Sequence, residues 1–216
     1  MNSQYDTDAA SKPMAFFDFD GTLTTGDTLM PFLKFVVGKP VYYIKLLMIS
    51  PVLVAYFLKL LRNDVAKQWV LKWYLSGYEL DTLLALGEEF SCKVIPKLLR
   101  QEGMEKLRWH QGQGHECILV SASLDVYLAS WSVSAGFDAL LSSKLESNSG
   151  VVSGNLYGDN CFGEEKVVRI KEWLAGRKPE ETFAYGDSNG DMPMLSLATV
   201  SMYLIKKRSK SYWRKI

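Results

Sequence analysis

Residues 14–22 read Met-Ala-Phe-Phe-Asp-Phe-Asp-Gly-Thr, and this stretch decides the fold of the chain. The apolar residues at its start predict a short buried strand, and Gly21 predicts a loop at the carboxyl end of that strand. Asp18 and Asp20 stand two residues apart at this end. Because side chains alternate along a strand, the two carboxylates point the same way if the pleat continues, and they can flank one ligand if it does not. The stretch therefore predicts a polar site where a buried strand ends.

Further apolar runs repeat this pattern along the chain. Strands are predicted at 117–121, 139–145, 182–185 and 199–204, and helices at 125–135, 166–175 and 191–197. Apolar strands that alternate with helices are typical of a parallel sheet covered on both faces. In such a sheet ligands bind beyond the carboxyl ends of the strands, where this chain has Asp18, Ser121 and Asp187. We therefore predict an α/β protein with a Rossmann-like parallel sheet as its core.

The stretch 27–99 interrupts this alternation after the first strand. It is rich in Leu, Tyr, Trp and Phe at helical spacing, so we expect an inserted all-helical cap subdomain. Residues 14–26 and 100–205 then form the core, with a helix at 101–113 leading back to the sheet. The polar residues 1–13 are expected to be a disordered leader. Residues 206–216 carry six Lys or Arg and no acid, and we expect a frayed basic tail there.

Residues 41–61 are the strongly apolar part of the insert. Lys45 and Lys59 bracket an uncharged run of only 13 residues (46–58), and Pro51 interrupts that run. Because a membrane-spanning helix needs about 20 apolar residues, we expect no span. A helix buried within the cap is the favoured explanation. The alternative is an exposed apolar face that makes peripheral contact with a membrane or with a greasy substrate.

The overall composition excludes several classes of protein. Apolar residues make up 48% of the 216 residues, which excludes a disordered chain, and a net charge of +1 leads us to expect no nucleic-acid partner. The three cysteines are widely spaced without a Cys-x-x-Cys pair, which argues against a disulfide framework or a zinc site. Since the N-terminus also lacks a signal-peptide pattern, we expect a cytoplasmic protein.

Four aspartates are expected to converge at one edge of the sheet. Asp187 and Asp191 follow the predicted strand 182–185, as Asp18 and Asp20 follow the first strand. Carboxylates in one shared site repel each other unless a hard cation lies among them. Oxygen ligands on strand ends suit Mg²⁺, which commonly binds beside a phosphate. Each aspartate taken singly is better explained as the cap of a helix or turn, but the set indicates a Mg²⁺ site.

Four motifs in this order resemble the haloacid dehalogenase (HAD) superfamily. They are Asp-x-Asp-Gly-Thr at 18–22, an apolar run that ends in Ser121, Lys166 at the start of a helix, and Gly-Asp-Ser-x-x-Asp at 186–191. Their order and spacing agree with the family. The helical insert between the first two motifs resembles the cap of the branch that includes phosphoserine phosphatase. The resemblance implies a phosphatase that hydrolyses phosphomonoesters through an aspartyl-phosphate intermediate.

The resemblance also implies a role for each motif residue. Asp18 would be the nucleophile that attacks phosphorus, and Asp20 the general acid for the leaving oxygen and then the general base for water. Ser121 and the ammonium of Lys166 would bind the phosphoryl oxygens.

The implied cofactor is Mg²⁺. Its ligands would be the carboxylates of Asp18 and Asp187 and the backbone carbonyl oxygen of Asp20. Asp191 would lie outside this ligand set and would orient a metal-bound water or Lys166.

The substrate is less clearly indicated than the chemistry. Asp27 stands where an acid that binds the amine of phosphoserine would be, but Ala122 and Gly190 replace the Gly and Asn usual in phosphoserine phosphatases. The apolar insert is reminiscent of HAD-type phosphatidylglycerophosphate phosphatases. We therefore expect a small phosphorylated molecule or a lipid head group as substrate. A phosphotransferase on the same scaffold, and phosphoserine phosphatase itself, remain as alternatives.

Overall fold

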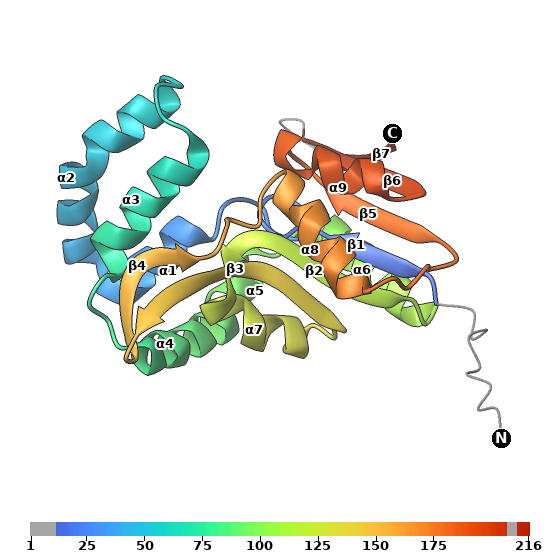
Figure 1. The fold of residues 1–216 in the computed structure, drawn as a ribbon, viewed down its shortest axis with the longest axis horizontal. Coiled ribbons are helices and arrows are strands. Elements are labelled where there is room, and N and C mark those ends of the chain that lie inside the picture. Colours follow the sequence, from blue (N-terminus) through green and yellow to red (C-terminus); the bar gives the residue numbers. More distant parts are fainter. Residues whose placement is uncertain (1–11, 207–210) are drawn as a thin grey trace.

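A seven-stranded sheet forms the centre of the structure, which is a computed structural model that describes residues 12–206 and 211–216 (Figure 1). Residues 1–11 of the predicted leader and 207–210 of the predicted tail lie outside the described residues. The strands are β1 (Met14–Phe17), β2 (Glu116–Leu124), β3 (Ala139–Asn148), β4 (Val151–Tyr157), β5 (Thr182–Gly186), β6 (Val200–Lys206) and β7 (Ser211–Lys215). The helices of the core are α6 (Gln101–Gly112), α7 (Asp125–Ser134), α8 (Glu164–Leu174) and α9 (Met192–Leu197).

The strands follow the order β4-β3-β2-β1-β5-β6-β7. The five central strands, which are β3, β2, β1, β5 and β6, pair in parallel, and this confirms the predicted α/β core. The two edge strands differ from the prediction because each pairs antiparallel with its neighbour. One of them is Ser211–Lys215, for which we expected a frayed tail, so that expectation was wrong for these residues.

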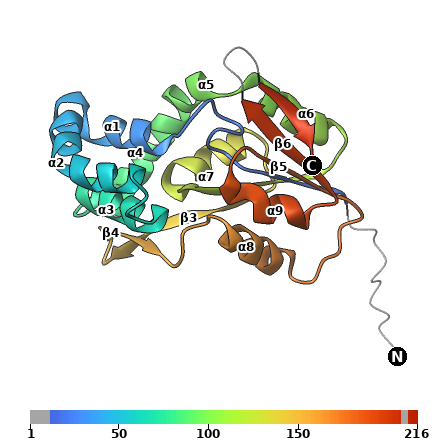
Figure 2. The ribbon, with the colours of Figure 1, turned by 90° about the horizontal axis from the view of Figure 1, so that it is seen from above.

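The alternation of side chains along β1 explains why both faces of the sheet are covered. Met14 and Phe16 point to one face and pack in a cluster with α8 and α9. Ala15 and Phe17 point to the other face, where the helices are α6 and α7 (Figure 2). All four side chains are at most 1% exposed. A strand buried on both faces positions the residue after it, Asp18, rigidly.

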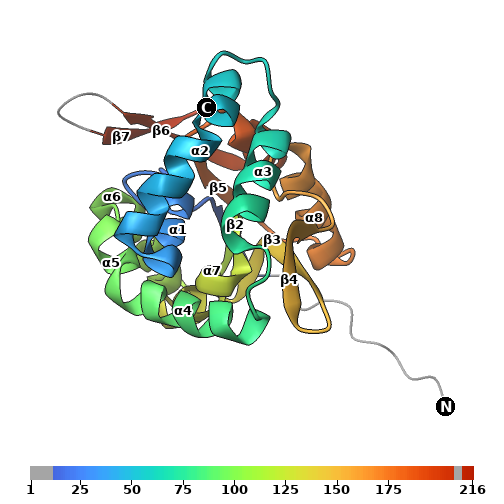
Figure 3. The same cartoon turned by 90° about the vertical axis from the view of Figure 1, so that its left-hand side faces the viewer.

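The inserted residues form five helices, which face the viewer in Figure 3. They are α1 (Leu29–Val37), α2 (Lys39–Phe57), α3 (Asn63–Leu75), α4 (Leu80–Lys93) and the short α5 (Ile95–Leu98). The turn between α3 and α4 is hydrogen-bonded to the β3–β4 hairpin: Gly77 N donates to Val152 O at 2.9 Å, and Val152 N donates to Tyr78 O at 2.8 Å. The insert is thus joined to the sheet by backbone pairing as well as by side-chain packing.

α4 lies directly on α7 of the core, and Gly87 makes this close approach possible. A Cβ atom at Gly87 would lie 1.8 Å from the carbonyl oxygen of Val126, so any larger residue would force the helices apart.

α2 is far more exposed than the sequence suggested. We expected a helix buried in the cap, but only Tyr42 and Ile49 of α2 are buried, while Leu47 and Phe57 are 75% and 77% exposed. Among the described residues, α2 is also the one helix long and apolar enough to cross a membrane by length and composition. Its exposed apolar residues are therefore not explained by packing within the cap.

Candidate active site

Three of the four predicted aspartates, Asp18, Asp187 and Asp191, converge at the carboxyl end of the sheet. Asp18 follows β1 and Asp187 follows the neighbouring β5, and the two strands are paired in register. Asp191 reaches the same place from the turn before α9, where Ser188 Oγ donates to its Oδ2 at 2.7 Å. One carboxylate oxygen from each of these three aspartates lies within 4.8 Å of the other two.

Lys166 lies in the middle of this acidic cluster and is itself 1% exposed. Its Nζ donates to Asp18 Oδ1 at 2.6 Å, to Asp191 Oδ1 at 2.7 Å and to the carbonyl oxygen of Val120 at 3.0 Å. α8 positions it, and two glutamates in the first turn of that helix complement the helix dipole.

The charges of this group shift one another's protonation equilibria. Burial opposes the charged form of Lys166, but Asp18 and Asp191 outweigh it and raise its pKa. Burial would likewise raise the pKa of Asp191, but the Lys166 ammonium and the Ser188 donors lower it. Burial and the adjacent Asp191 charge raise the pKa of Asp18. One lysine therefore does not neutralise the site, and further positive charge would stabilise ionised Asp18.

The carboxylates fit a divalent cation for a second reason. Thr22 Oγ1 lies 2.9 Å from Asp18 Oδ2 and 2.9 Å from Asp187 Oδ1, yet a hydroxyl group has one proton to donate. The Thr22 hydroxyl can therefore donate to only one of these two carboxylate oxygens at a time, and the other then receives no hydrogen bond from it. The other oxygen of Asp187 contacts the ammonium of Lys206. Two carboxylates turned toward the same small space are the kind of ligand set that Mg²⁺ prefers.

Asp20 is held apart from this cluster. Its Oδ1 accepts hydrogen bonds from Thr28 N at 2.9 Å and from Thr28 Oγ1 at 2.6 Å, and its Oδ2 accepts from Ser123 Oγ. Burial, together with the charge of Asp27, raises the pKa of Asp20 to about 6. Asp20 is thus more readily protonated than an ordinary aspartate, as a proton donor requires.

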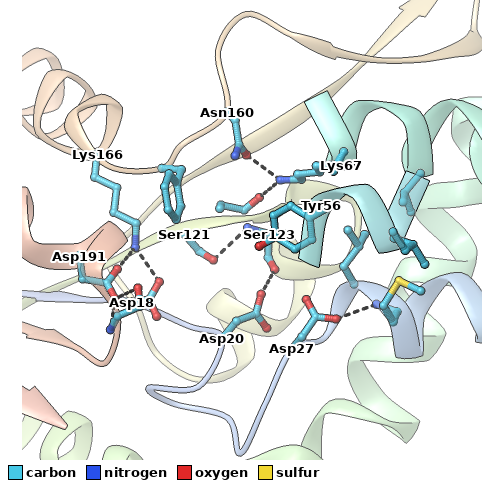
Figure 4. A pocket seen from close by; sticks show the side chains of 18 of the residues that line it. Asp18, Asp20, Asp27, Tyr56, Lys67, Ser121, Ser123, Asn160, Lys166 and Asp191 are labelled. Carbon is cyan, nitrogen blue, oxygen red and sulfur yellow. Dashed lines mark hydrogen bonds and ion pairs between the residues drawn. The ribbon is translucent and has the colours of Figure 1, made fainter. Parts of the chain in front are cut away.

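A cavity of about 520 Å³ opens over these residues (Figure 4). Asp18, Asp20, Ser121, Lys166 and Asp191 line its floor. Its upper wall comes from the inserted helices and is largely apolar, and its residues are Leu29, Met30, Leu53, Tyr56, Phe57, Ala66, Lys67 and Val70. The cavity therefore combines a polar, charged floor with an apolar roof.

Ser121 and Asp27 both line the cavity, and each already accepts a hydrogen bond from a backbone N–H group. Ser121 is 1% exposed, and its Oγ accepts from Ser123 N at 3.0 Å. Asp27 also lines the cavity, but its Oδ2 accepts from Met30 N at 3.0 Å at the start of α1. That bond gives Asp27 a structural task in addition to any contact with a substrate.

Sequence reasoning missed three residues near the site. Thr22 belongs to the quoted motif, but only the folded chain shows that it links Asp18 to Asp187. Lys206 was assigned to the tail. Lys67 gave no signal, because a lysine on an amphipathic helix is usually solvated.

Comparison with known proteins agrees with this geometry. A family model for haloacid dehalogenase-like hydrolases matches residues 15–196. The chain belongs to this family. Protein CicA of Caulobacter vibrioides (strain NA1000 / CB15N) is 34% identical over 190 residues, which cover 88% of this chain and 84% of CicA. A phosphoserine phosphatase of Streptococcus thermophilus is 27% identical over 142 residues, covering 60% of this chain and 66% of that enzyme.

Solved structures are similar as well. The crystal structure of a protein of unknown function from Bordetella pertussis Tohama I has a TM-score of 0.76, with 28% identity and 88% coverage of both chains. Membership of the HAD family identifies this chain as a hydrolase. The aspartates at the strand ends belong to the motifs that resemble this family.

Proposed function

We propose that this HAD protein is a Mg²⁺-dependent phosphomonoester hydrolase that works through a phosphorylated Asp18. The observation that carries the proposal is the buried Lys166, held between Asp18 and Asp191 with Asp187 beside them. An ammonium and several carboxylates buried around one cavity suit a transferring phosphoryl group, which needs charge neutralisation and positioning.

In the first step the Asp18 carboxylate attacks phosphorus, so that an Asp18–phosphorus bond forms as the ester bond breaks. Lys166 and Ser121 bind the phosphoryl oxygens. Asp20 donates its proton to the leaving alcohol, and Thr28 and Ser123 hold the Asp20 carboxyl in place for this transfer.

In the second step water attacks the phosphorus of phospho-Asp18. Asp20, now ionised, takes the proton of that water, and inorganic phosphate and the free Asp18 carboxylate result. The carboxylates of Asp18 and Asp187 and the carbonyl oxygen of Asp20 would hold Mg²⁺, while Asp191 keeps Lys166 in position. Bound Mg²⁺ would supply neutralisation of the charge on the phosphoryl oxygens.

The test is a panel of aryl, amino-acid, sugar, nucleotide and lysolipid phosphates, assayed for release of inorganic phosphate. Removal of divalent cations with EDTA is expected to lower the rate at least about 100-fold, because metal stabilisation of transition-state charge contributes several kcal/mol. Excess Mg²⁺ is expected to restore the rate. A rate that EDTA leaves unchanged would contradict the proposal.

The same panel separates the alternatives. Phosphorylated Asp18 without release of phosphate to water would indicate a phosphotransferase. A strong preference for phosphoserine would indicate phosphoserine phosphatase, although Gly190 speaks against it. A Cβ atom at Gly190 would lie only 2.2 Å from Cε2 of Phe162, so the Phe162 ring occupies the space that a larger side chain at position 190 would need. The ring of Phe162, and not an asparagine, therefore borders the cavity.

The apolar roof favours a lipid phosphomonoester within this class. Leu53, Tyr56 and Phe57 belong to α2 and line the cavity. The same helix exposes Ile44, Leu47 and other apolar side chains to solvent. A lipid whose phosphate reaches Asp18 would thus meet apolar side chains of α2 in the cavity, and the same helix presents further apolar side chains on its outer surface. Such a substrate does not conflict with the cytoplasmic location that we continue to predict from the three free cysteines.

We further infer that α2 lies on an anionic membrane surface. Residues 28–63 contain five Lys or Arg and no acidic residue, which complements anionic lipid. Tyr74 Oη donates to the carbonyl oxygen of Tyr42, and Trp73 Nε1 donates to that of Lys45, so α2 is held against α3. A helix tied to its neighbour in this way suits peripheral contact better than a span.

Binding to vesicles tests this contact. The double variant Ile44→Asn/Leu47→Asn is expected to bind vesicles of phosphatidylcholine and phosphatidylglycerol at least about 10-fold more weakly than the unchanged protein, because each apolar side chain contributes about 1.5–3 kcal/mol when buried. Leu84→Asn is a matched control, since Leu84 is an exposed leucine on α4. Equal binding by all three proteins, or equal binding to pure phosphatidylcholine, would contradict the contact with anionic lipid.

A further inference from the structure

Lys67 is a half-buried cation that the proposed chemistry does not use. It lies on α3 and lines the cavity over the active site. Its Nζ donates to the carbonyl oxygen of Ala122 at 2.5 Å and to Asn160 Oδ1 at 2.6 Å (Figure 4). Both acceptors are neutral, and both belong to the core.

The charge of Lys67 is less well compensated than that of Lys166. Lys166 forms ion pairs with two carboxylates, whereas among the residues that the structure describes no carboxylate forms an ion pair with Lys67. Burial accordingly lowers the pKa of Lys67 to about 8, although the charges of Asp20 and Asp27 oppose this. A partly desolvated ammonium held by neutral oxygens gains more from a new anionic partner than one already paired.

The position of Lys67 indicates which part of a substrate it would meet. Lys166 and Lys67 enter the cavity from opposite sides (Figure 4). Lys67 binds the carbonyl oxygen of Ala122, and the next residue, Ser123, binds Asp20, so Asp20 is linked to the side of Lys67. Since Asp20 is the proposed proton donor to the leaving oxygen, the group that leaves phosphorus lies on this side as well. Lys67 therefore faces the leaving group and not the transferred phosphoryl group.

We propose that Lys67 binds a second anionic group of the substrate, so that the enzyme selects phosphomonoesters whose leaving alcohol carries a phosphodiester or a carboxylate. This inference rests on the proposed phosphatase function. It assigns Lys67 to specificity, because a site built around a partly buried charge disfavours substrates that leave that charge without its partner.

A purely structural role is the competing explanation. The bonds to Ala122 and Asn160 fasten α3 to the core, and on this explanation Lys67 only stabilises the position of α3, whatever the substrate is. The two explanations differ in one measurable quantity, which is the selectivity between substrates with and without the second anion. If Lys67 only stabilises α3, its loss lowers the rates for both kinds of substrate together. If Lys67 binds the second anion, its loss lowers the rate only for the substrate that carries this anion.

The experiment uses three soluble substrates that share one end. Glycerol 3-phosphate has no second anion, 3-phosphoglycerate has a carboxylate, and a glycerol 3-phosphate with a methyl phosphodiester on its other terminal hydroxyl has a diester anion. For the full chain we expect kcat/KM to be at least about 10-fold higher for one of the two anionic substrates than for glycerol 3-phosphate. The preferred one identifies the source of the anion.

Variants then assign this selectivity. Lys67→Met is expected to reduce the ratio of kcat/KM values at least about 10-fold, chiefly through KM, and Lys67→Arg to retain most of it because the charge remains. Lys72→Met is the matched control, because Lys72 is an exposed lysine on the same helix. The ratio is measured within one protein preparation, so partial unfolding of a variant does not change it.

Two outcomes overturn the inference. One is a ratio that Lys67→Met leaves unchanged, and the other is an unchanged protein that releases phosphate but does not prefer either anionic substrate. Absence of phosphate release from these compounds and from an aryl phosphate alike would instead show that the proposed function itself is wrong.

Discussion

Replacement of Asp18 by asparagine is expected to lower the rate of phosphate release at least about 1000-fold, since the covalent step loses its nucleophile. The amide of asparagine is nearly the same size as the carboxylate but is neutral and a poor nucleophile. Because the pocket keeps its shape, the variant is expected to remain folded and still to bind substrate. The measurement is kcat for an aryl phosphate, together with trapping of phosphorylated protein from a radiolabelled substrate.

Asp159→Asn is the matched control for this variant. Asp159 lies in the loop before α8 and is exposed, and the same change there removes one negative charge without touching the cavity floor. Its rate is expected to stay within about 2-fold of the unchanged protein, as is usual for surface substitutions. Phosphorylated protein that still forms in Asp18→Asn would show that another residue is the nucleophile.

Asp20→Asn is expected to have an effect of about 100- to 10,000-fold that depends on the leaving group. An alkyl phosphate has a poor leaving oxygen that needs a proton, so its rate is expected to fall most. An aryl phosphate leaves as a stable phenolate and is expected to lose much less in the first step. The measurement is kcat/KM for both kinds of ester in the variant and in the unchanged protein.

Ser123→Ala is a useful companion to this variant. It removes the hydroxyl that donates to Asp20 Oδ2 but leaves the carboxyl itself. Its effect is expected to have the same direction and to be smaller, because Thr28 still binds the other oxygen. Equal losses for alkyl and aryl esters in Asp20→Asn would contradict the role of general acid.

The sequence allowed the acidic cluster to be predicted because its residues follow strands. Apolar runs such as 14–17 and 182–185 are recognisable locally, and the residue that follows such a run must lie at the edge of the sheet. Asp18 and Asp187 were placed together on this ground, and the structure brings them within reach of one hydroxyl group. A pattern of residues that are adjacent in the sequence is thus enough to predict a site formed where two strands end side by side.

Features that depend on distant packing were not predicted. The repeat of apolar residues in α2 indicates a helix, but it does not show which residues face solvent when most of them are apolar. β7 carries basic residues, and only its pairing with β6 makes it a strand. The contact of Lys67 with Ala122 and Asn160 joins residues far apart in the chain. No property of residues 63–75 alone distinguishes this lysine from a solvated one.

The hairpin bonds at Gly77 and Tyr78 have a consequence for how the enzyme admits its substrate. With that turn anchored and Gly87 of α4 pressed on α7, the second half of the insert cannot swing away as a lid without breaking backbone pairs. α3 is likewise fastened to the core, because Lys67 binds Ala122 and Asn160. We therefore expect the substrate to enter beside the exposed apolar side chains of α2, where the lipid phosphate that we propose as substrate would have only a short way to travel from a bilayer.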